Sequence, residues 1–291
     1  MAKYYYLIAG LPSLSLEDAK PIYTVERFRT ELEGMLSKGD QRLIDLFFLQ
    51  YDNANLLRYC QDPEAKLDVR GKLTADDFAA VYQALKEEEK VPTIAGMPSY
   101  MVDFLRMRWE EESREKAERK MIPWEDRLAA YYYAFAMRCG NRFVADWYEL
   151  NLNIRNLLTA FTCRKHGLER SNYIVGDNEV AQQLRTSNAR DFNVGDLMEL
   201  FADLQRVAEE SDLLTREKKV DMLKWQWLAD QTFFKTFDIE SVFAYLLQIE
   251  MTERWTTLDK TTGEQTFRSI VGAMKKGSEN ALDEFKRNNN R

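Results

Sequence analysis

The side chain with the greatest potential for covalent chemistry is Cys163, which is followed by Arg164, Lys165 and His166. Neighbouring cations lower the pKa of a thiol and favour the nucleophilic thiolate. The same four residues also fit the last turn of a helix, where basic side chains complement the helix dipole and cysteine is a small apolar residue. We expect this structural role for Cys163 and His166, and a helical enzyme that uses Cys163 as nucleophile is one alternative.

The remaining ionisable residues do not form a familiar catalytic pattern. His166 is the only histidine, which excludes most catalytic zinc sites and the paired Glu-x-x-His di-iron bundle. Asp76 and Asp77 lack the third carboxylate of a D-D-x-x-D metal motif, and the glutamates at 110–112 occupy adjacent faces of a charged helix. The chain contains no G-x-x-x-x-G-K-[ST] nucleotide-binding loop. We therefore expect no catalytic residue, no cofactor-binding residue and no metal site.

Composition narrows the class of protein further. The chain has 291 residues, of which 12 are Gly and 6 are Pro, and this scarcity of helix breakers favours long helices. Its net charge of -7 makes it a poor ligand for nucleic acid or anionic membranes. The three cysteines, Cys60, Cys139 and Cys163, have no C-x-x-C spacing, which favours a reducing cytoplasm. The longest apolar run, residues 128–137, is about half a membrane span, and residues 4–11 make a poor signal peptide.

Helical patterns account for most of the chain and predict an all-α fold. Thr74 is a predicted N-cap, Pro123 suits a first helical turn, and Gly167 is a predicted C-cap. We expect residues 4–8 to form a short N-terminal strand or the start of a helix, residues 167–195 to be the longest irregular stretch, and residues 288–291 to fray. The predicted helices cover residues 75–86, 99–120, 124–139, 143–165, 197–207, 220–228 and 237–255.

Three tyrosines lie at equal intervals in strongly apolar helical segments. Tyr51, Tyr148 and Tyr245 are each 97 positions apart, and the first two are followed by a carboxylate, asparagines and an apolar residue before Arg. This spacing predicts three helical units, at residues 1–97, 98–194 and 195–291, which together could form one body. Three ordinary amphipathic helices are the alternative interpretation.

Asparagines on these predicted helices need a reason, because Asn favours neither helix interiors nor burial without partners. The residues concerned are Asn53, Asn55, Asn151, Asn153 and Asn156. They either bond to neighbouring helix termini and fix how helices cross, or line a polar contact surface.

Several segments resemble the C subunit, also called d, of rotary V/A-type ATPases. Residues 51–58 (YDNANLLR) and 148–158 (YELNLNIRNLL) resemble the repeated helix of that family. Residues 237–247 (FDIESVFAYLL) resemble its C-terminal Gly-x-Glu helix, with Phe237 in place of Gly and with Glu250 and Glu253 near its acidic positions. The opening residues 4–14 (YYYLIAGLPSL) are similar, more specifically, to an uncharacterised bacterial family encoded with V-type ATPase subunits.

This resemblance implies a mechanical role without a catalytic site. The family's members are all-helical, consist of three similar units, and form a socket of the central stalk on the cytoplasmic face of the inner membrane. The implied partners are the rotor shaft subunits and the membrane proteolipid ring, with no nucleic acid partner and no direct membrane insertion. A generic all-helical adaptor or scaffold would also lack catalytic residues, so the identity of the partner distinguishes these two functions.

Overall fold

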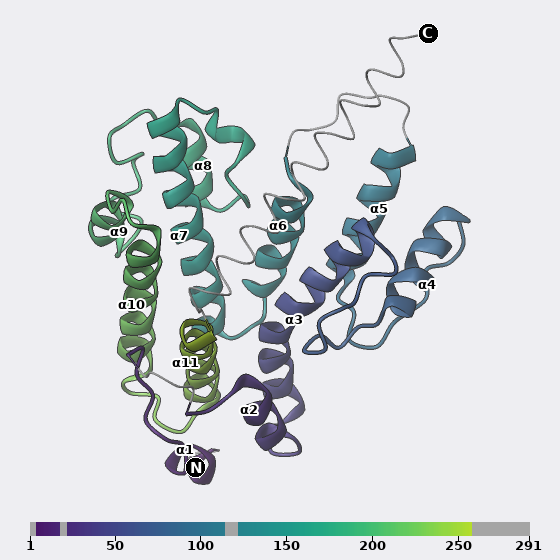
Figure 1. Cartoon of the computed structure of the whole chain (residues 1–291), viewed down its shortest axis with the longest axis horizontal. Helices are drawn as coiled ribbons and strands as arrows, with labels where there is room; N and C mark the ends of the chain where they lie inside the picture. Colours follow the sequence, from purple (N-terminus) through teal and green to yellow (C-terminus); the bar gives the residue numbers. More distant parts are fainter. Residues whose placement is uncertain (1–3, 18–21, 114–121, 258–291) are drawn as a thin grey trace. The chain divides into compact units, whose positions relative to one another are not determined.

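The computed structural model describes residues 4–17, 22–113 and 122–257, and within these ranges it contains eleven α-helices, one 3-10 helix and no strand (Figure 1). The predicted all-α class is confirmed. No helix in the described ranges is long and apolar enough to cross a membrane. The helices are α1 (Tyr5–Ala9), α2 (Val25–Leu32), α3 (Lys38–Gln61), α4 (Ala75–Lys86), α5 (Ser99–Ser113), α6 (Trp124–Ala136), α7 (Arg142–His166), η1 (Arg170–Asn172), α8 (Glu179–Thr186), α9 (Phe201–Ala208), α10 (Leu213–Thr232) and α11 (Ile239–Thr257).

The chain divides into two compact units. The first consists of Met1–Ile8 and Leu32–Ala244, and the second of Ala9–Glu31 and Tyr245–Arg291. In the first unit, α3 packs on α4 and α6, α5 packs between α4 and α6, and α7 joins this group to α8 and α9 (Figure 1). The division into thirds at residues 97 and 194 stays a prediction.

Local sequence signals explain where the two longest helices of the first unit begin and where the second of them ends. The Ser37 hydroxyl caps α3 by accepting the backbone N–H of Asp40 at 3.2 Å. The Asn141 side chain caps α7 by accepting the N–H of Val144 at 3.1 Å. At the other end of α7, Gly167 has a φ of +66°, the left-handed conformation of a helix C-cap, which confirms its predicted role.

The core of the first unit is continuous along α7. Its side chains at Ile154, Leu157 and Ala160 pack against apolar residues of α8, α9 and the loop between them. Phe192 in that loop is fully buried, and the Arg164 guanidinium lies 3.6 Å above its ring centroid. The apolar face of α7 thus determines where α8 and α9 pack.

The second unit has its own aromatic core. Tyr23, Phe28 and Tyr245 pack together with ring centroids 5.3 to 6.2 Å apart. The Tyr245 hydroxyl donates to the Pro12 carbonyl at 2.8 Å, and Glu253 accepts the backbone N–H of Val25 at 3.1 Å. These contacts tie the N-terminal segment of the unit to its part of α11.

Two sequence-based predictions need correction. The strand considered for residues 4–8 is wrong, because Tyr5–Ala9 forms α1, in which the Ile8 N–H donates to the Tyr4 carbonyl at 3.0 Å. The stretch 167–195 is not irregular throughout, because it contains η1 and the eight-residue helix α8. Asn178 caps α8 by accepting the Ala181 N–H at 3.0 Å.

Candidate functional site

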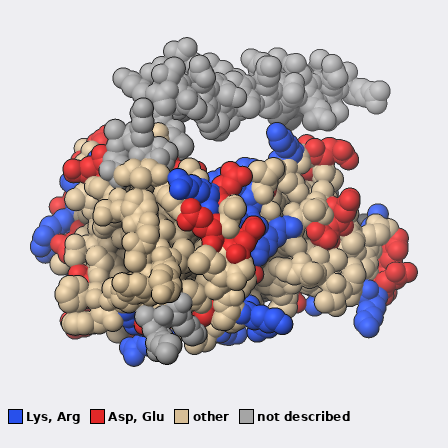
Figure 2. All heavy atoms as spheres, turned by 90° about the horizontal axis from the view of Figure 1, so that it is seen from below, with Lys and Arg blue, Asp and Glu red and all other residues tan. Residues whose placement is uncertain are grey.

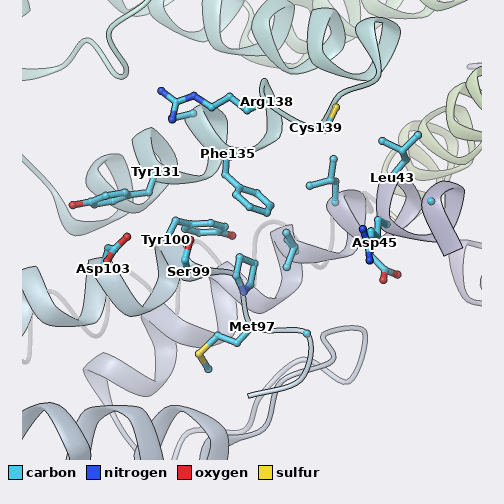
Figure 3. Close-up of a pocket in the computed structure, with 17 residues that line it drawn as sticks. Leu43, Asp45, Met97, Ser99, Tyr100, Asp103, Tyr131, Phe135, Arg138 and Cys139 are labelled. Carbon is cyan, nitrogen blue, oxygen red and sulfur yellow. The ribbon is translucent and has the colours of Figure 1, made fainter. Parts of the chain in front are cut away.

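A groove of about 850 Å³ opens between three helices of the first unit (Figure 3). Its walls are residues 39–49 of α3, residues 96–103 of the loop before α5 and of its first turns, and residues 131–139 at the end of α6. We call it the α3–α5–α6 groove. Its volume lies within the range of known ligand and partner pockets.

Apolar side chains line most of this groove. Leu43, Leu46 and Leu49 follow one another at three-residue intervals along the same side of α3. On the opposite wall, Tyr100 and Phe135 point toward one another in Figure 3, with ring centroids 5.3 Å apart. Phe135 is 38% exposed, so an apolar ring remains accessible to a partner.

Partly buried hydrogen bonds hold the groove wall in place. The Tyr100 hydroxyl donates to the Asn53 side-chain oxygen at 2.8 Å, which joins α5 to α3. The Tyr132 hydroxyl lies 2.8 Å from the Leu46 carbonyl and 3.0 Å from the Tyr148 hydroxyl, which joins α6 to α3 and α7. Burial raises the pKa of Tyr100 and Tyr132 well above the ordinary value, so both hydroxyls remain donors at neutral pH.

Charged groups stand at the edge of the groove. Arg42 and Arg138 are exposed, and Figure 3 shows Arg138 extending away from the aromatic rings. Asp45 forms an ion pair with Lys72, and Asp103 forms one with Arg106 at 3.4 Å. The groove therefore combines an apolar interior with an edge of both signs, as protein interfaces do.

The groove contains no activated nucleophile among its described residues. Cys139 lies in its wall, but burial raises the pKa of the thiol, and the sulfur donates to the Asn141 carbonyl at 3.4 Å. A thiol with a raised pKa stays protonated at neutral pH and reacts slowly. No group of three or more His, Cys, Asp or Glu in the described ranges is placed to hold a metal ion.

Cys163 lies outside this groove, in the last turns of α7, and is only 2% exposed. Burial raises the pKa of its thiol, and this effect outweighs the lowering by Arg170. The Arg164 guanidinium is directed to other groups than the thiol: it donates to the Arg190 and Ala189 carbonyls, each at 2.6 Å. His166 is exposed at the helix end. The geometry favours the structural role for Cys163 over the enzyme alternative.

Three of the acidic residues singled out in the sequence belong to a helix cap or to ion pairs. Asp77 and Thr74 form a capping box at the start of α4. Glu111 pairs with Arg127 at 2.7 Å, and Glu112 pairs with Arg108 at 2.7 Å. The Glu111 pair joins α5 to α6, whereas Asp77 and Glu112 act within their own helices in these contacts.

Two of the helical asparagines bond to loop residues rather than to the helix termini that were predicted as their partners. Asn55 accepts the N–H of Asp68 at 2.7 Å and donates to the carbonyl of the same residue at 2.9 Å. Asn156 makes the same pair of bonds with Val175, at 2.9 and 2.7 Å. We call this two-bond arrangement the asparagine clamp. Each clamp fastens a long helix to the loop that follows it.

Two further asparagines also join separate segments, and one does not. Asn53 accepts from Tyr100, and Asn153 accepts from Asn178, the cap of α8, at 2.9 Å. Asn151 donates to the Trp147 carbonyl of its own helix at 2.8 Å. The sequence indicated that these amides need partners, but it did not identify them.

The matched tyrosines have different surroundings. Tyr148 is 5% exposed, in contact with Tyr132 and Phe243, whereas Tyr51 is 8% exposed and lies beneath the Arg70 guanidinium at 4.2 Å. Tyr245 belongs to the aromatic core of the second unit. The two asparagine clamps are 101 positions apart, one helical turn more than the tyrosine spacing of 97.

A family model described as "Protein of unknown function (DUF2764)" matches residues 1–278, so the chain belongs to this family. No curated protein and no solved structure matches the chain. The family description names no activity, and a function must be inferred from the residues and their geometry.

Proposed function

We propose that this member of the DUF2764 family is a non-catalytic central-stalk subunit of a V/A-type rotary ATPase. It would act as a socket that couples the soluble rotor shaft to the membrane proteolipid ring during ion transport. The α3–α5–α6 groove carries the proposal, because it is an accessible, mainly apolar surface on a frame of long helices. The sequence resemblance to the C subunit supplies the identity of the partners.

Rigidity supports a role in transmitting torque. The asparagine clamps at Asn55 and Asn156 fasten the loops after the 24-residue α3 and the 25-residue α7. Each clamp satisfies a backbone donor and acceptor of one residue, buried at Val175 and partly buried at Asp68, so the loop cannot move without breaking both bonds. A frame held in this way deforms little under load.

Surface charge supports protein partners rather than nucleic acid. On the face shown in Figure 2, the described Lys and Arg side chains lie among Asp and Glu side chains. Phosphate backbones bind surfaces with a basic excess, and the net charge of -7 provides the opposite. We place the protein on the cytoplasmic face of the inner membrane, attached through the ATPase complex.

Purification of the tagged full-length chain from its own membranes tests this proposal. We expect shaft and proteolipid ring subunits, identified by mass spectrometry, to co-purify with the wild type. Phe135→Glu and Met97→Glu place a charge in the groove wall and should reduce that recovery at least tenfold. Met222→Glu is the matched control, because Met222 is 54% exposed on α10 and lies outside the groove.

Thermal unfolding of each variant separates loss of binding from loss of folding. Equal recovery of ATPase subunits with the wild type and with both groove variants would show that the groove is not the interface. Recovery of neither shaft nor ring subunits would reject the rotary ATPase role.

A generic helical adaptor is the second candidate, favoured by the same groove. An adaptor would co-purify with a reproducible set of partner proteins, and Phe135→Glu would reduce their recovery. That set would contain no ATPase subunit. The same purification therefore distinguishes the two functions.

A further inference from the structure

A second groove, of about 740 Å³, lies in the first unit between α7 and α10. Its walls are residues 151–173 of α7 and the following turn, residues 208–224 from the end of α9 into α10, and Tyr133. We call it the α7–α10 groove. Figure 1 shows these two long helices running side by side.

Apolar side chains line this groove and continue beyond it. Ile154, Leu158 and Val220 belong to the core or pack against it, and they close the groove from the inside. At the rim, Leu168 is 46% exposed and Leu213 is 62% exposed. Leu214, next to the groove, is 61% exposed. The apolar surface thus extends past the cavity, which fits a macromolecular segment better than a small molecule.

The charge of the groove is opposite in sign to that of the whole chain. Its lining includes Lys165, Arg216 and Lys224 as well as Arg155, which pairs with Asp126. Its acidic members are Glu210 and Glu217, and Glu210 forms an ion pair with Lys219 at 2.6 Å. Basic groups therefore exceed acidic ones in a chain whose net charge is -7.

Arg216 has a buried donor whose acceptor is missing from the described residues. Its Nε is buried and has no hydrogen-bond partner among the described residues. Buried donors are nearly always satisfied in native proteins, so this exception requires an acceptor such as a water or a group of a partner. Arg216 lines the groove, and a carboxylate is the preferred acceptor for a guanidinium.

We infer that the α7–α10 groove binds an acidic amphipathic helix of a protein partner. The apolar face of that helix would cover Leu158, Val220 and Leu213, and its carboxylates would meet Lys165 and Arg216. Apolar anchors and complementary charges are the usual basis of helix-in-groove recognition. This inference goes beyond the proposed function, because it concerns a different surface and holds whether or not the partner is an ATPase subunit.

A designed pair of helical peptides tests the inference with the full-length protein. Both peptides carry Leu at i, i+3, i+4 and i+7, with Glu at the other positions of one and Lys at those of its counterpart. We expect the Glu peptide to bind, to bind more weakly as salt increases, and to bind at least ten times more tightly than the Lys peptide. Fluorescence anisotropy of the labelled peptides measures both affinities.

Variants locate the binding on the groove. Lys165→Gln and Arg216→Gln should each lower the affinity for the Glu peptide at least tenfold. Leu213→Ser should lower the affinity for both peptides. Lys218→Gln is the matched control, because Lys218 is exposed on α10 and does not line the groove. Unchanged thermal unfolding confirms that Lys165→Gln and Leu213→Ser act on binding rather than folding.

Three outcomes would overturn the inference: equal affinity for both peptides, an equal effect of Lys165→Gln and Lys218→Gln, or no binding up to about 1 mM peptide. None of these outcomes depends on recovery of ATPase subunits. The two proposals can therefore fail separately.

Discussion

At the scale of single residues, buried amides and hydroxyls determine how the long helices connect to the rest of the protein. Asn55 and Asn156 are fully buried, and each satisfies both backbone groups of one loop residue. Asp52, which is 1% exposed, accepts the N–H groups of Lys72 and Leu73 at 2.7 and 2.9 Å. An unmade bond at such positions costs more than a made bond contributes, so these side chains specify one arrangement of the loops.

Removal of an asparagine clamp tests this role. Asn156→Ala leaves the N–H and carbonyl of Val175 without partners in the interior, and it should lower the free energy of unfolding by about 3 kcal/mol. Asn151→Ala is the control on the same helix, because Asn151 donates to the Trp147 carbonyl within its own helix, and it should cost less than about 0.5 kcal/mol. Urea unfolding measures both values. Similar losses for the two variants would contradict a special role for the clamp.

The tyrosines provide a second test at this scale. Tyr148→Ala removes a ring from the interior of the first unit, and it should destabilise the protein by about 3 kcal/mol. Tyr148→Phe keeps the ring, loses only the hydrogen bond with Tyr132, and should cost about 1 kcal/mol.

Tyr245→Ala should cost about as much as Tyr148→Ala, about 3 kcal/mol, because Tyr245 anchors the aromatic core of the second unit. Unchanged melting temperatures for both alanine variants would remove the physical basis of the proposed repeat.

At the scale of elements, the loop between α3 and α4 depends on the absence of a side chain at Gly71. A Cβ there would lie 2.6 Å from the Asn55 amide nitrogen and 2.7 Å from an Asp52 carboxylate oxygen. Gly71→Ala should therefore displace this buried network and cost about 2 kcal/mol. Gly39→Ala is the matched control within α3, where the nearest atom is 3.9 Å away, and it should stabilise the helix by about 0.5 to 1 kcal/mol. Denaturant unfolding gives the sign of each change.

The same loop should contribute to the acid sensitivity of the protein. Hydrogen bonds from Arg70 lower the pKa of Asp68 from 3.8 to about 2. Because the pKa is lower in the folded state, ionised Asp68 contributes stability above pH 3.8, and that contribution is lost as the pH falls through about 2.

Asp68→Asn and Arg70→Gln should each flatten the fall in unfolding free energy over that pH range. Urea unfolding at several pH values compares the slopes. Parallel curves for the wild type and both variants would show that Asp68 does not contribute.

The sequence predicted elements better than it predicted their contacts. The predicted caps at Thr74 and Gly167 lie next to the residues they cap, so local chemistry was sufficient to find those helix ends. The sequence did not predict helix α8, because its buried residues are Val180, Ala181 and Leu184. Three apolar positions in a stretch rich in Asn and Asp are too few to show a helical period. Of the two alternatives for residues 4–8, the helix start is the one found, and the 50% and 90% exposure of Tyr5 and Tyr6 contradicts a buried apolar strand.

The grooves lay beyond what sequence patterns reveal. The α3–α5–α6 groove joins side chains from residues 39–49, 96–103 and 131–139, and no spacing rule relates positions so far apart. Similarly, Cys163 is adjacent to three basic groups in sequence, yet burial determines the direction of its pKa shift. Tertiary packing thus determines the grooves and the pKa of Cys163, the features that bear most directly on function.

At the scale of the whole molecule, binding to a partner should raise the free energy of unfolding and the melting temperature of the chain. A partner that binds only the folded chain adds RT ln(1 + [L]/Kd), about 2.7 kcal/mol at a partner concentration of 100 Kd. We expect the wild type within the purified shaft and ring assembly to melt at a higher temperature than the isolated chain.

Phe135→Glu should remove most of that gain at the same protein concentrations, because its carboxylate would be desolvated against the apolar wall of the α3–α5–α6 groove. Met222→Glu should retain the gain, since this exposed position on α10 lies outside the groove. Differential scanning fluorimetry with a dye attached to the chain can follow its unfolding within the assembly. An equal rise for Phe135→Glu and Met222→Glu would place the interface elsewhere, since a groove that carries the contact must lose binding when a charge enters it.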